Sequence, residues 1–178
     1  VKDTLAGAKP LMTDEQMKEV LTTWQTELRT KSLEKNRKEG DDFLAANKKK
    51  EGIQVIPVTL GTNTYELQYK VETKGTGKLP TTNDTVSAHY RGTLVNGEEF
   101  DSSYKRGEPQ SFPVTGVIPG WTQALLRMPV GSKWKLFIPS ELAYGERGRP
   151  GIPANSTLLF DIELVAIKDP NEAGATSK

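Results

Sequence analysis

The spacing of apolar residues changes once along this chain, near residue 52, and this change limits the folds open to it. Before that point, apolar residues recur at three- and four-residue steps, which is typical of one face of an α-helix. After it, apolar and polar residues alternate, as they do in half-buried β-strands. We therefore expect an α+β protein, with a long N-terminal helix followed by a curled antiparallel sheet wrapped on one short helix.

Residues 13–48 carry the signals of one long helix. Thr13 followed by Gln16 matches a capping box, which starts a helix by pairing its first free backbone N–H groups. At 1.5 Å per residue, such a helix would be roughly 54 Å long. Its polar stretch, 29–42, is typical of a solvent-bridging connector, and Gly40 within it costs about 1 kcal/mol relative to Ala. A single apolar stripe lies near its start: Met17, Val20, Leu21, Trp24 and Leu28.

Two partners could bury this apolar stripe. One is the second region of the same chain, and the other is a second copy of the protein. An amphipathic stripe on a long polar stalk is hard to bury by other means, which favours the second copy. We therefore expect a homodimer formed through the N-terminal helix.

The second region has the pattern of several antiparallel strands. Apolar and polar residues alternate over 66–71 and 85–90, and Asn96-Gly97 is a strong signal for a hairpin turn. Residues 120–128, between Pro119 and Pro129, are its only helical pattern. The chain thus divides into a helical stalk and dimerisation segment (1–52), a connector or extra strand (53–65), a sheet domain (66–168) and a disordered tail (169–178).

Composition excludes several classes of function. The net charge of +1 argues against a dedicated nucleic-acid binder, because neutralising phosphates requires a strong positive field. With no cysteine and a single histidine, His89, we expect no Cys-ligated or His-based metal site. No apolar run approaches the ~20 residues that cross a bilayer. Because the chain begins with Val1, it is either a processed mature protein or a trimmed piece, and a removed export signal is possible.

Aromatic residues are few, yet many stand where strands and helices are expected to end. Ends of elements are where pockets are built. The residues at these ends predict an aromatic-walled pocket with one carboxylate, one guanidinium and one phenol. Such a pocket has neither a nucleophile nor a proton shuttle, so it is suited to binding and orienting a substrate.

At these ends stand four motifs that together resemble the FKBP-type peptidyl-prolyl cis-trans isomerases. The resemblance covers residues 66–168, and its motifs are FDSS at 100–103, VIPGW at 117–121, AYGERGRPGIP at 143–153 and STLLFDIEL at 156–164. The first region resembles the stalk of the macrophage-infectivity-potentiator (Mip-like) branch, in LMTDEQMKEVLTTWQTEL and GDDFLAANKKKEGI. In that branch an N-terminal helical part dimerises, and this chain is expected to lack the first part of that module.

The resemblance implies a set of site residues. Trp121 would form the floor on which a proline ring rests, and Arg106 would pair with Asp101 behind the pocket. Gln110 stands where related proteins often carry an aromatic residue, so one wall is expected to be more polar. The catalytic residues implied are Phe100, Asp101, Trp121 and Tyr144. The substrate-binding residues implied are Tyr90, Arg106, Phe112, Val117, Ile118, Ile152 and Phe160.

The same resemblance implies the activity and the partners. The protein would catalyse rotation about X-Pro bonds without any cofactor, acting on proline-containing proteins and binding macrolide inhibitors of the FK506 and rapamycin type. It would be an exported bacterial protein, in the periplasm, at the outer membrane or secreted, with a cytoplasmic location as the alternative. A second interpretation is a chaperone that binds unfolded chains through stalk and pocket, with isomerisation incidental.

Overall fold

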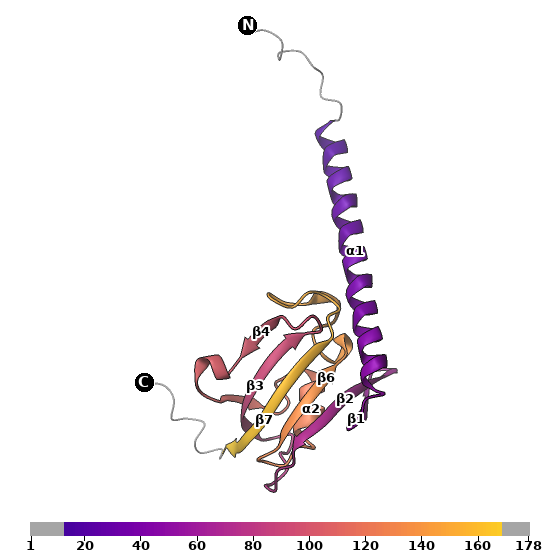
Figure 1. Ribbon diagram of the computed structural model, residues 1–178. Helices are drawn as coiled ribbons and strands as arrows, with labels where there is room; N and C mark the ends of the chain where they lie inside the picture. The colour runs from indigo at the N-terminus through magenta and orange to yellow at the C-terminus, as the bar shows by residue number, and fades with distance from the viewer. Residues whose placement is uncertain (1–12, 169–178) are drawn as a thin grey trace, which may run out of the picture.

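The computed structural model describes residues 13–168 and has a long helix standing on a curled sheet (Figure 1). Helix α1 (Asp14–Asn47) contains 34 residues, which corresponds to about 51 Å. Its predicted capping box is confirmed, because the Gln16 N–H donates to Thr13 Oγ1 at 3.2 Å and the Thr13 N–H to Gln16 Oε1 at 2.9 Å. The tail expected to be disordered, 169–178, lies outside the described residues.

Seven antiparallel strands form one sheet, and the predicted α+β class is confirmed. Along the sheet the order is β1-β2-β6-β7-β3-β4, and β5 also pairs with β3. The Asn96-Gly97 hairpin joins β3 to β4 as predicted, with Gly97 at φ +88°. The segment 53–65 contains β1 and its turn into β2. The strands are β1 (Ile53–Leu60), β2 (Asn63–Thr73), β3 (Thr85–Leu94), β4 (Glu99–Ser102), β5 (Gln110–Pro113), β6 (Lys133–Ile138) and β7 (Leu158–Lys168).

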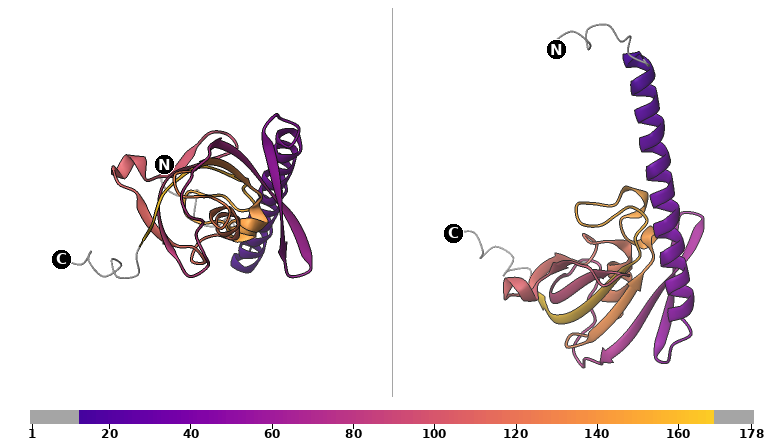
Figure 2. Two further views of the ribbon diagram at one scale, coloured as in Figure 1. Left: turned by 90° about the horizontal axis from the view of Figure 1, so that it is seen from below. Right: turned by 45° about the horizontal axis from the view of Figure 1, so that its top comes forward.

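The sheet curls around the short helix α2 (Pro119–Leu125), which is seen end-on inside the ring of strands in Figure 2. Pro119 occupies the first turn, where its missing N–H costs nothing. Gly120 lets the helix approach β6, since a Cβ there would lie 2.6 Å from Ile138 Cγ2. Sequence periodicity missed three turns of 3₁₀-helix because each has only three residues: η1 (Tyr104–Arg106), η2 (Ser140–Leu142) and η3 (Gly145–Arg147).

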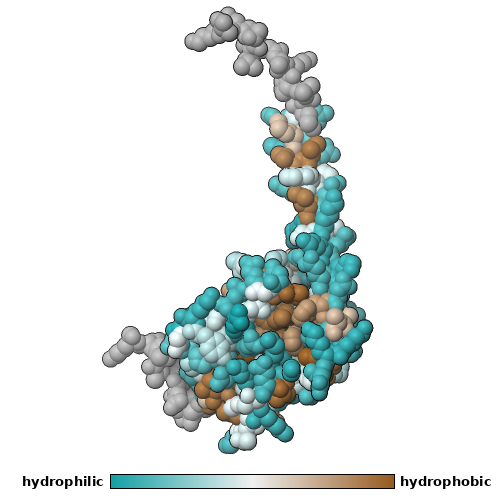
Figure 3. Space-filling model, in the orientation of Figure 1, coloured by the Kyte–Doolittle hydropathy of each residue, from teal (hydrophilic) through white to brown (hydrophobic). Residues whose placement is uncertain are grey.

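The apolar stripe on the N-terminal half of α1 does not pack on the sheet, so docking on the second region of the same chain is wrong for this structure. Its five side chains are between 47% and 58% exposed, and apolar surface is visible on the upper half of the helix in Figure 3. The reason is the position of the stripe along the helix. It ends at Leu28, whereas hydrogen bonds from α1 to the sheet domain begin only at Leu33, so the N-terminal half of α1 extends beyond the domain (Figure 1).

The C-terminal half of α1 is docked, so the expectation of a solvent-bridging connector is wrong from Leu33 onward. Gly40, Leu44 and Asn47 are buried in this half. Asn47 Nδ2 donates to Gln68 Oε1 at 3.0 Å, and Gln68 Nε2 donates to the Leu44 carbonyl at 2.9 Å. The docked face carries polar side chains that are hydrogen-bonded when buried, and an apolar-stripe pattern cannot detect such a face.

Candidate active site

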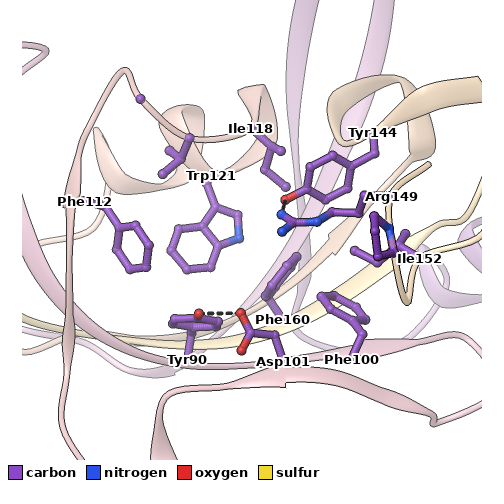
Figure 4. A pocket seen from close by; sticks show the side chains of 13 residues that line it. Tyr90, Phe100, Asp101, Phe112, Ile118, Trp121, Tyr144, Arg149, Ile152 and Phe160 are labelled. Carbon is purple, nitrogen blue, oxygen red and sulfur yellow. Dashed lines mark hydrogen bonds between the residues drawn. The ribbon is translucent and has the colours of Figure 1, made fainter. Parts of the chain in front are cut away.

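A cavity of about 560 Å³ opens where α2 meets the curled sheet (Figure 4). Ten of the eleven site residues expected from the sequence line it, and Arg106 lies just outside. These residues come from β3, β4, β5, α2, β7 and two loops, so folding brings together segments that are far apart in the chain. The lining consists of Tyr90, Phe100, Asp101, Phe112, Gly116, Val117, Ile118, Trp121, Tyr144, Arg149, Pro150, Ile152 and Phe160.

Trp121 forms one wall of the cavity. It stands in the first turn of α2, and its side chain is only 4% exposed. Three rings meet it in edge contacts, with centroid distances of 5.3 Å to Tyr90, 5.3 Å to Phe112 and 5.1 Å to Phe160. Edge-to-face pairs of this kind are favourable and fix the orientation of each ring. The indole is therefore held rigidly and presents one surface to the cavity.

Gly92 in β3 makes room for the rings on the opposite wall. It pairs with Phe160 of β7 on one side and with Asp101 of β4 on the other. A Cβ at Gly92 would lie 2.5 Å from Phe100 Cζ and 2.8 Å from Phe160 Cε1. The two phenylalanine rings can meet edge to face, with centroids 5.5 Å apart, only because this strand residue has no side chain.

A closed triangle of hydrogen bonds holds the carboxylate at the edge of the cavity. The Tyr90 hydroxyl donates to Asp101 Oδ2 at 2.6 Å (Figure 4). Arg106 donates through Nη1 to Asp101 Oδ1 at 2.7 Å and through Nη2 to the Tyr90 hydroxyl oxygen at 2.6 Å. Arg106 thus lies behind the cavity wall, and both carboxylate oxygens are engaged.

The triangle also sets the pKa of its members. Partial burial by itself raises the pKa of Asp101, but the hydrogen bonds from Tyr90 and Arg106, together with the Arg106 charge, leave that pKa below its usual value. Burial raises the pKa of Tyr90, and its hydrogen bond to Asp101 adds to the rise. Asp101 is therefore ionised and Tyr90 neutral at neutral pH.

Hydrogen-bond donors stand free at the opening of the cavity. The Tyr144 hydroxyl accepts from Arg149 Nη1 at 2.9 Å, so its own proton remains available to a bound molecule. The Ile118 backbone N–H donates to no described residue. The buried Trp121 Nε1 has no partner among the described residues, and it points into the cavity in Figure 4. Because a buried donor without a partner is costly, such a site favours a ligand with carbonyl oxygens.

Sequence reasoning missed three lining residues, Gly116, Arg149 and Pro150. The signal for two of them was present, since Arg149 and Pro150 stand inside the Gly- and Pro-rich loop that also carries Ile152. The Arg149 guanidinium lies 5.1 Å above the Tyr144 ring, and only the path of the loop determines this position. Gln110 does not line the cavity, and Phe112 forms that wall instead, so the expected polar wall is not found.

Within residues 13–168, no three histidine or acidic side chains gather in a way that would hold a metal ion. Across the same residues, no helix has both the length and the apolar character needed to cross a membrane.

Two protein families match this chain. Residues 76–165 match the family described as FKBP-type peptidyl-prolyl cis-trans isomerase. Residues 1–71 match the domain described as amino terminal to FKBP-type peptidyl-prolyl isomerase. The second match includes α1, β1 and most of β2, so the boundary between the two matches lies within the sheet.

Individual relatives are similar over nearly the whole chain. The FKBP-type peptidyl-prolyl cis-trans isomerase FkpA of Aeromonas hydrophila is 46% identical over 97% of this chain and 64% of its own length. The outer membrane protein MIP of Legionella longbeachae is 46% identical over 94% of this chain and 72% of its own length. The crystal structure of FkpA from Escherichia coli superimposes with a TM-score of 0.74, at 40% identity over 90% of this chain and 75% of that chain. This chain therefore spans between 64% and 72% of the length of these two curated relatives.

Proposed function

Because the chain belongs to the FKBP-type peptidyl-prolyl cis-trans isomerase family, we propose that it catalyses cis–trans rotation about X-Pro bonds in protein substrates and so assists their folding. The observation that carries the proposal is the aromatic cavity built around Trp121, with hydrogen-bond donors free to bind a substrate at Trp121 Nε1, the Ile118 N–H and the Tyr144 hydroxyl. The sheet domain, 66–168, is the isomerase domain of this proposal, and 1–52 is its stalk.

To catalyse this reaction, the protein must bind a twisted amide. The barrier to rotation is about 18–20 kcal/mol and comes from amide resonance, which the twisted transition state has lost. A site that fits the twisted form better than the planar one lowers that barrier without any covalent step. The proline ring would rest on Trp121 between Phe112 and Phe160. An apolar cavity favours the twisted amide, because it is less dipolar than the planar amide and loses less on leaving water.

Polar groups at the edge would orient the substrate carbonyls. The Tyr144 hydroxyl and the Ile118 N–H each have a proton that no acceptor among the described residues binds. They would donate it to substrate carbonyls and so fix the peptide on both sides of the proline. Asp101 would act through its charge on the carbonyl that rotates. It transfers no proton in this scheme, because the hydrogen bonds from Tyr90 and Arg106 keep its pKa below the usual value, so that it is ionised and a weak base. Arg149 would hold the Tyr144 hydroxyl in a donating orientation.

The proposal extends to ligands, assembly and location. Macrolides of the FK506 and rapamycin type are expected to occupy the same cavity. A homodimer through the exposed stripe of α1 is expected, because five apolar side chains on one helix face remain uncovered. Export to the periplasm or outer membrane is supported by the relative named as an outer membrane protein.

An isomerisation assay on a proline tetrapeptide tests the function. The protein should raise the rate constant above the uncatalysed value, and a stoichiometric macrolide of the FK506 type should remove the increase. Trp121→Ala should lower kcat/KM about tenfold or more, whereas Trp134→Phe, at a tryptophan outside the cavity lining, should stay near the parent. If the parent shows only the uncatalysed rate, the remaining interpretation is a chaperone that binds unfolded chains without isomerising them. The exposed apolar stripe of α1 favours that interpretation.

A further inference from the structure

The stalk helix touches the same loop that carries part of the cavity wall. We call residues 143–157 the pocket loop and residues 33–47 of α1 the docked segment. The pocket loop joins η2 to β7 and supplies Tyr144, Arg149 and Ile152 to the cavity. In Figure 1 this loop extends from the side of α1 across the top of the sheet. One face of the loop therefore meets the cavity, and its base meets the helix.

Two asparagines join the docked segment to the pocket loop through backbone carbonyls. Asn36 Nδ2 donates to the Ala154 carbonyl at 2.8 Å. In the opposite direction, Asn155 Nδ2 donates to the Leu33 carbonyl at 3.4 Å. Asn155 is 3% exposed and has φ +56°, a left-handed conformation that asparagine tolerates better than most residues. Its N–H donates to the Gly145 carbonyl at 2.8 Å, so it fastens the base of the pocket loop.

Gly40 fixes the distance between helix and loop. A Cβ at this position would lie 2.3 Å from Thr157 Oγ1 and 3.1 Å from Thr157 Cβ. In mid-helix, glycine is unfavourable by about 1 kcal/mol relative to alanine. Its presence is explained by the close approach of the Thr157 side chain, which any side chain at position 40 would meet. Thr157 directly precedes β7, so this contact sets where the pocket loop ends.

The pocket loop has little regular structure to hold it. It contains the short η3 turn and one isolated bridge between Arg149 and Ile152. Arg37 of the docked segment adds ion pairs, 3.9 Å from Glu141 in η2, just before the pocket loop, and 3.4 Å from Glu146 near its start. Exposed pairs of this kind contribute little by themselves. Firmer support comes from the partly buried hydrogen bonds of Asn36 and Asn155 and from the close packing at Gly40.

We propose that the docked segment is a positioning element for the cavity, because its Gly40 and Asn36 hold the loop that aims Tyr144, Arg149 and Ile152 at the substrate. This inference rests on the proposed isomerase function and adds residues outside the cavity that set its affinity for substrate.

A compensating pair of substitutions tests the proposal. Gly40→Ala places its Cβ against the Thr157 hydroxyl and should raise the KM for a proline tetrapeptide about 3- to 30-fold, the range of positioning effects transmitted through packed contacts. The value of kcat should stay within about twofold, because a misplaced loop weakens ground-state and transition-state binding alike. Adding Thr157→Ala removes the oxygen that clashes and should restore KM to near the parent value. Thr157→Ala alone should change little.

A second variant avoids the clash altogether. Asn36→Ala removes only the hydrogen bond to Ala154 and should raise KM in the same direction, while Glu34→Ala, on the exposed face of the same helix, should leave KM unchanged. Amide hydrogen exchange separates a specific effect on the pocket loop from a general loss of stability. The Ile152 and Asn155 amides should exchange faster in Gly40→Ala and in Asn36→Ala, with the Leu136 amide of the sheet unchanged.

The two ways of failing are distinguishable. If the parent is active, and both variants keep its KM and its loop exchange rates, the positioning proposal is wrong while the function stands. If exchange at Leu136 rises together with the loop, α1 supports the whole domain and the specific role is contradicted. If the parent does not isomerise the peptide, the proposed function fails, and loop exchange still reports whether α1 holds the loop.

Discussion

Gly92 is the residue on which the geometry of the cavity wall most depends. Gly92→Ala would place a methyl group where the Phe100 and Phe160 rings now lie. Overpacking of this kind costs about 1–3 kcal/mol. We expect the free energy of unfolding to fall by about that amount and kcat/KM to fall about tenfold as the two rings are displaced. Denaturant titration and the tetrapeptide assay measure the two effects.

The neighbouring variant Thr93→Ala is the control for Gly92→Ala, since successive strand residues point to opposite faces. It should change kcat/KM less than twofold. An alanine at position 92 with parental activity would mean that the two rings need not touch for catalysis.

Asp101 gives the protein a pH-dependent contribution to stability. Its folded pKa lies below the unfolded value of about 3.9. A lowered carboxyl pKa stabilises the fold above the unfolded pKa, and this stabilisation is lost as the pH falls through the folded pKa. The difference in Tm between the parent and Asp101→Asn should therefore be constant above about pH 5 and shrink below about pH 4. Thermal unfolding between pH 7 and pH 2.5 measures it, and a difference that does not vary with pH would contradict the assignment.

Residues in spaced motifs were the predictable part of the candidate site. Phe100, Trp121 and Ile152 stand in motifs whose order along the chain implied a shared pocket, and they do line one cavity. Arg149 was not predictable, because its direction depends on how the pocket loop turns over Tyr144. Gly92 was not predictable either, since alternation in β3 indicates which face a residue takes but not which rings it meets.

The two halves of α1 differ in what surrounds them, and the N-terminal half leads to a prediction on assembly. Leu21→Glu combined with Trp24→Glu places two charges on the exposed stripe. If the stripe joins two copies, sedimentation equilibrium at micromolar concentration should report a dimer for the parent and a monomer for the double variant, because buried unpaired charges are strongly unfavourable.

The activity of the double variant is the first control. Both residues lie on α1 before the docked segment, so kcat/KM for a tetrapeptide should remain at the parental value. Glu19→Lys, a charge change on the face of the same helix opposite the stripe, should leave the oligomeric state unchanged. A parent that is monomeric across the micromolar range would remove the proposed homodimer for this chain.

The elements themselves were predicted well where one physical signal dominated. The capping box at Thr13 located the start of α1, and Asn96-Gly97 located the β3–β4 hairpin. The polar part of the docking of α1 could not be predicted, because Asn36, Gly40 and Asn47 belong to no apolar stripe. Their contacts are hydrogen bonds and a close backbone approach to segments more than twenty residues away in the chain.

At the scale of the whole molecule, the stalk meets the sheet domain at two places, the pocket loop and strand β2. The sheet curls around α2 and brings the cavity wall together, while α1 rises from the sheet with its apolar stripe exposed (Figure 1). The α+β architecture followed from the single change in hydrophobic spacing. The relation between α1 and the cavity did not, because spacing describes each element separately and not how two of them meet.

The central claim is that the cavity lowers the barrier to X-Pro rotation and does more than bind proline peptides. NMR exchange spectroscopy on a proline tetrapeptide, with the protein at a small fraction of the peptide concentration, measures binding and interconversion in one sample. The account predicts cis–trans exchange well above the uncatalysed rate with the parent protein and close to that rate with Trp121→Ala. Peptide signals that shift on binding while the exchange rate stays uncatalysed with the parent would contradict the claim and leave a binding module.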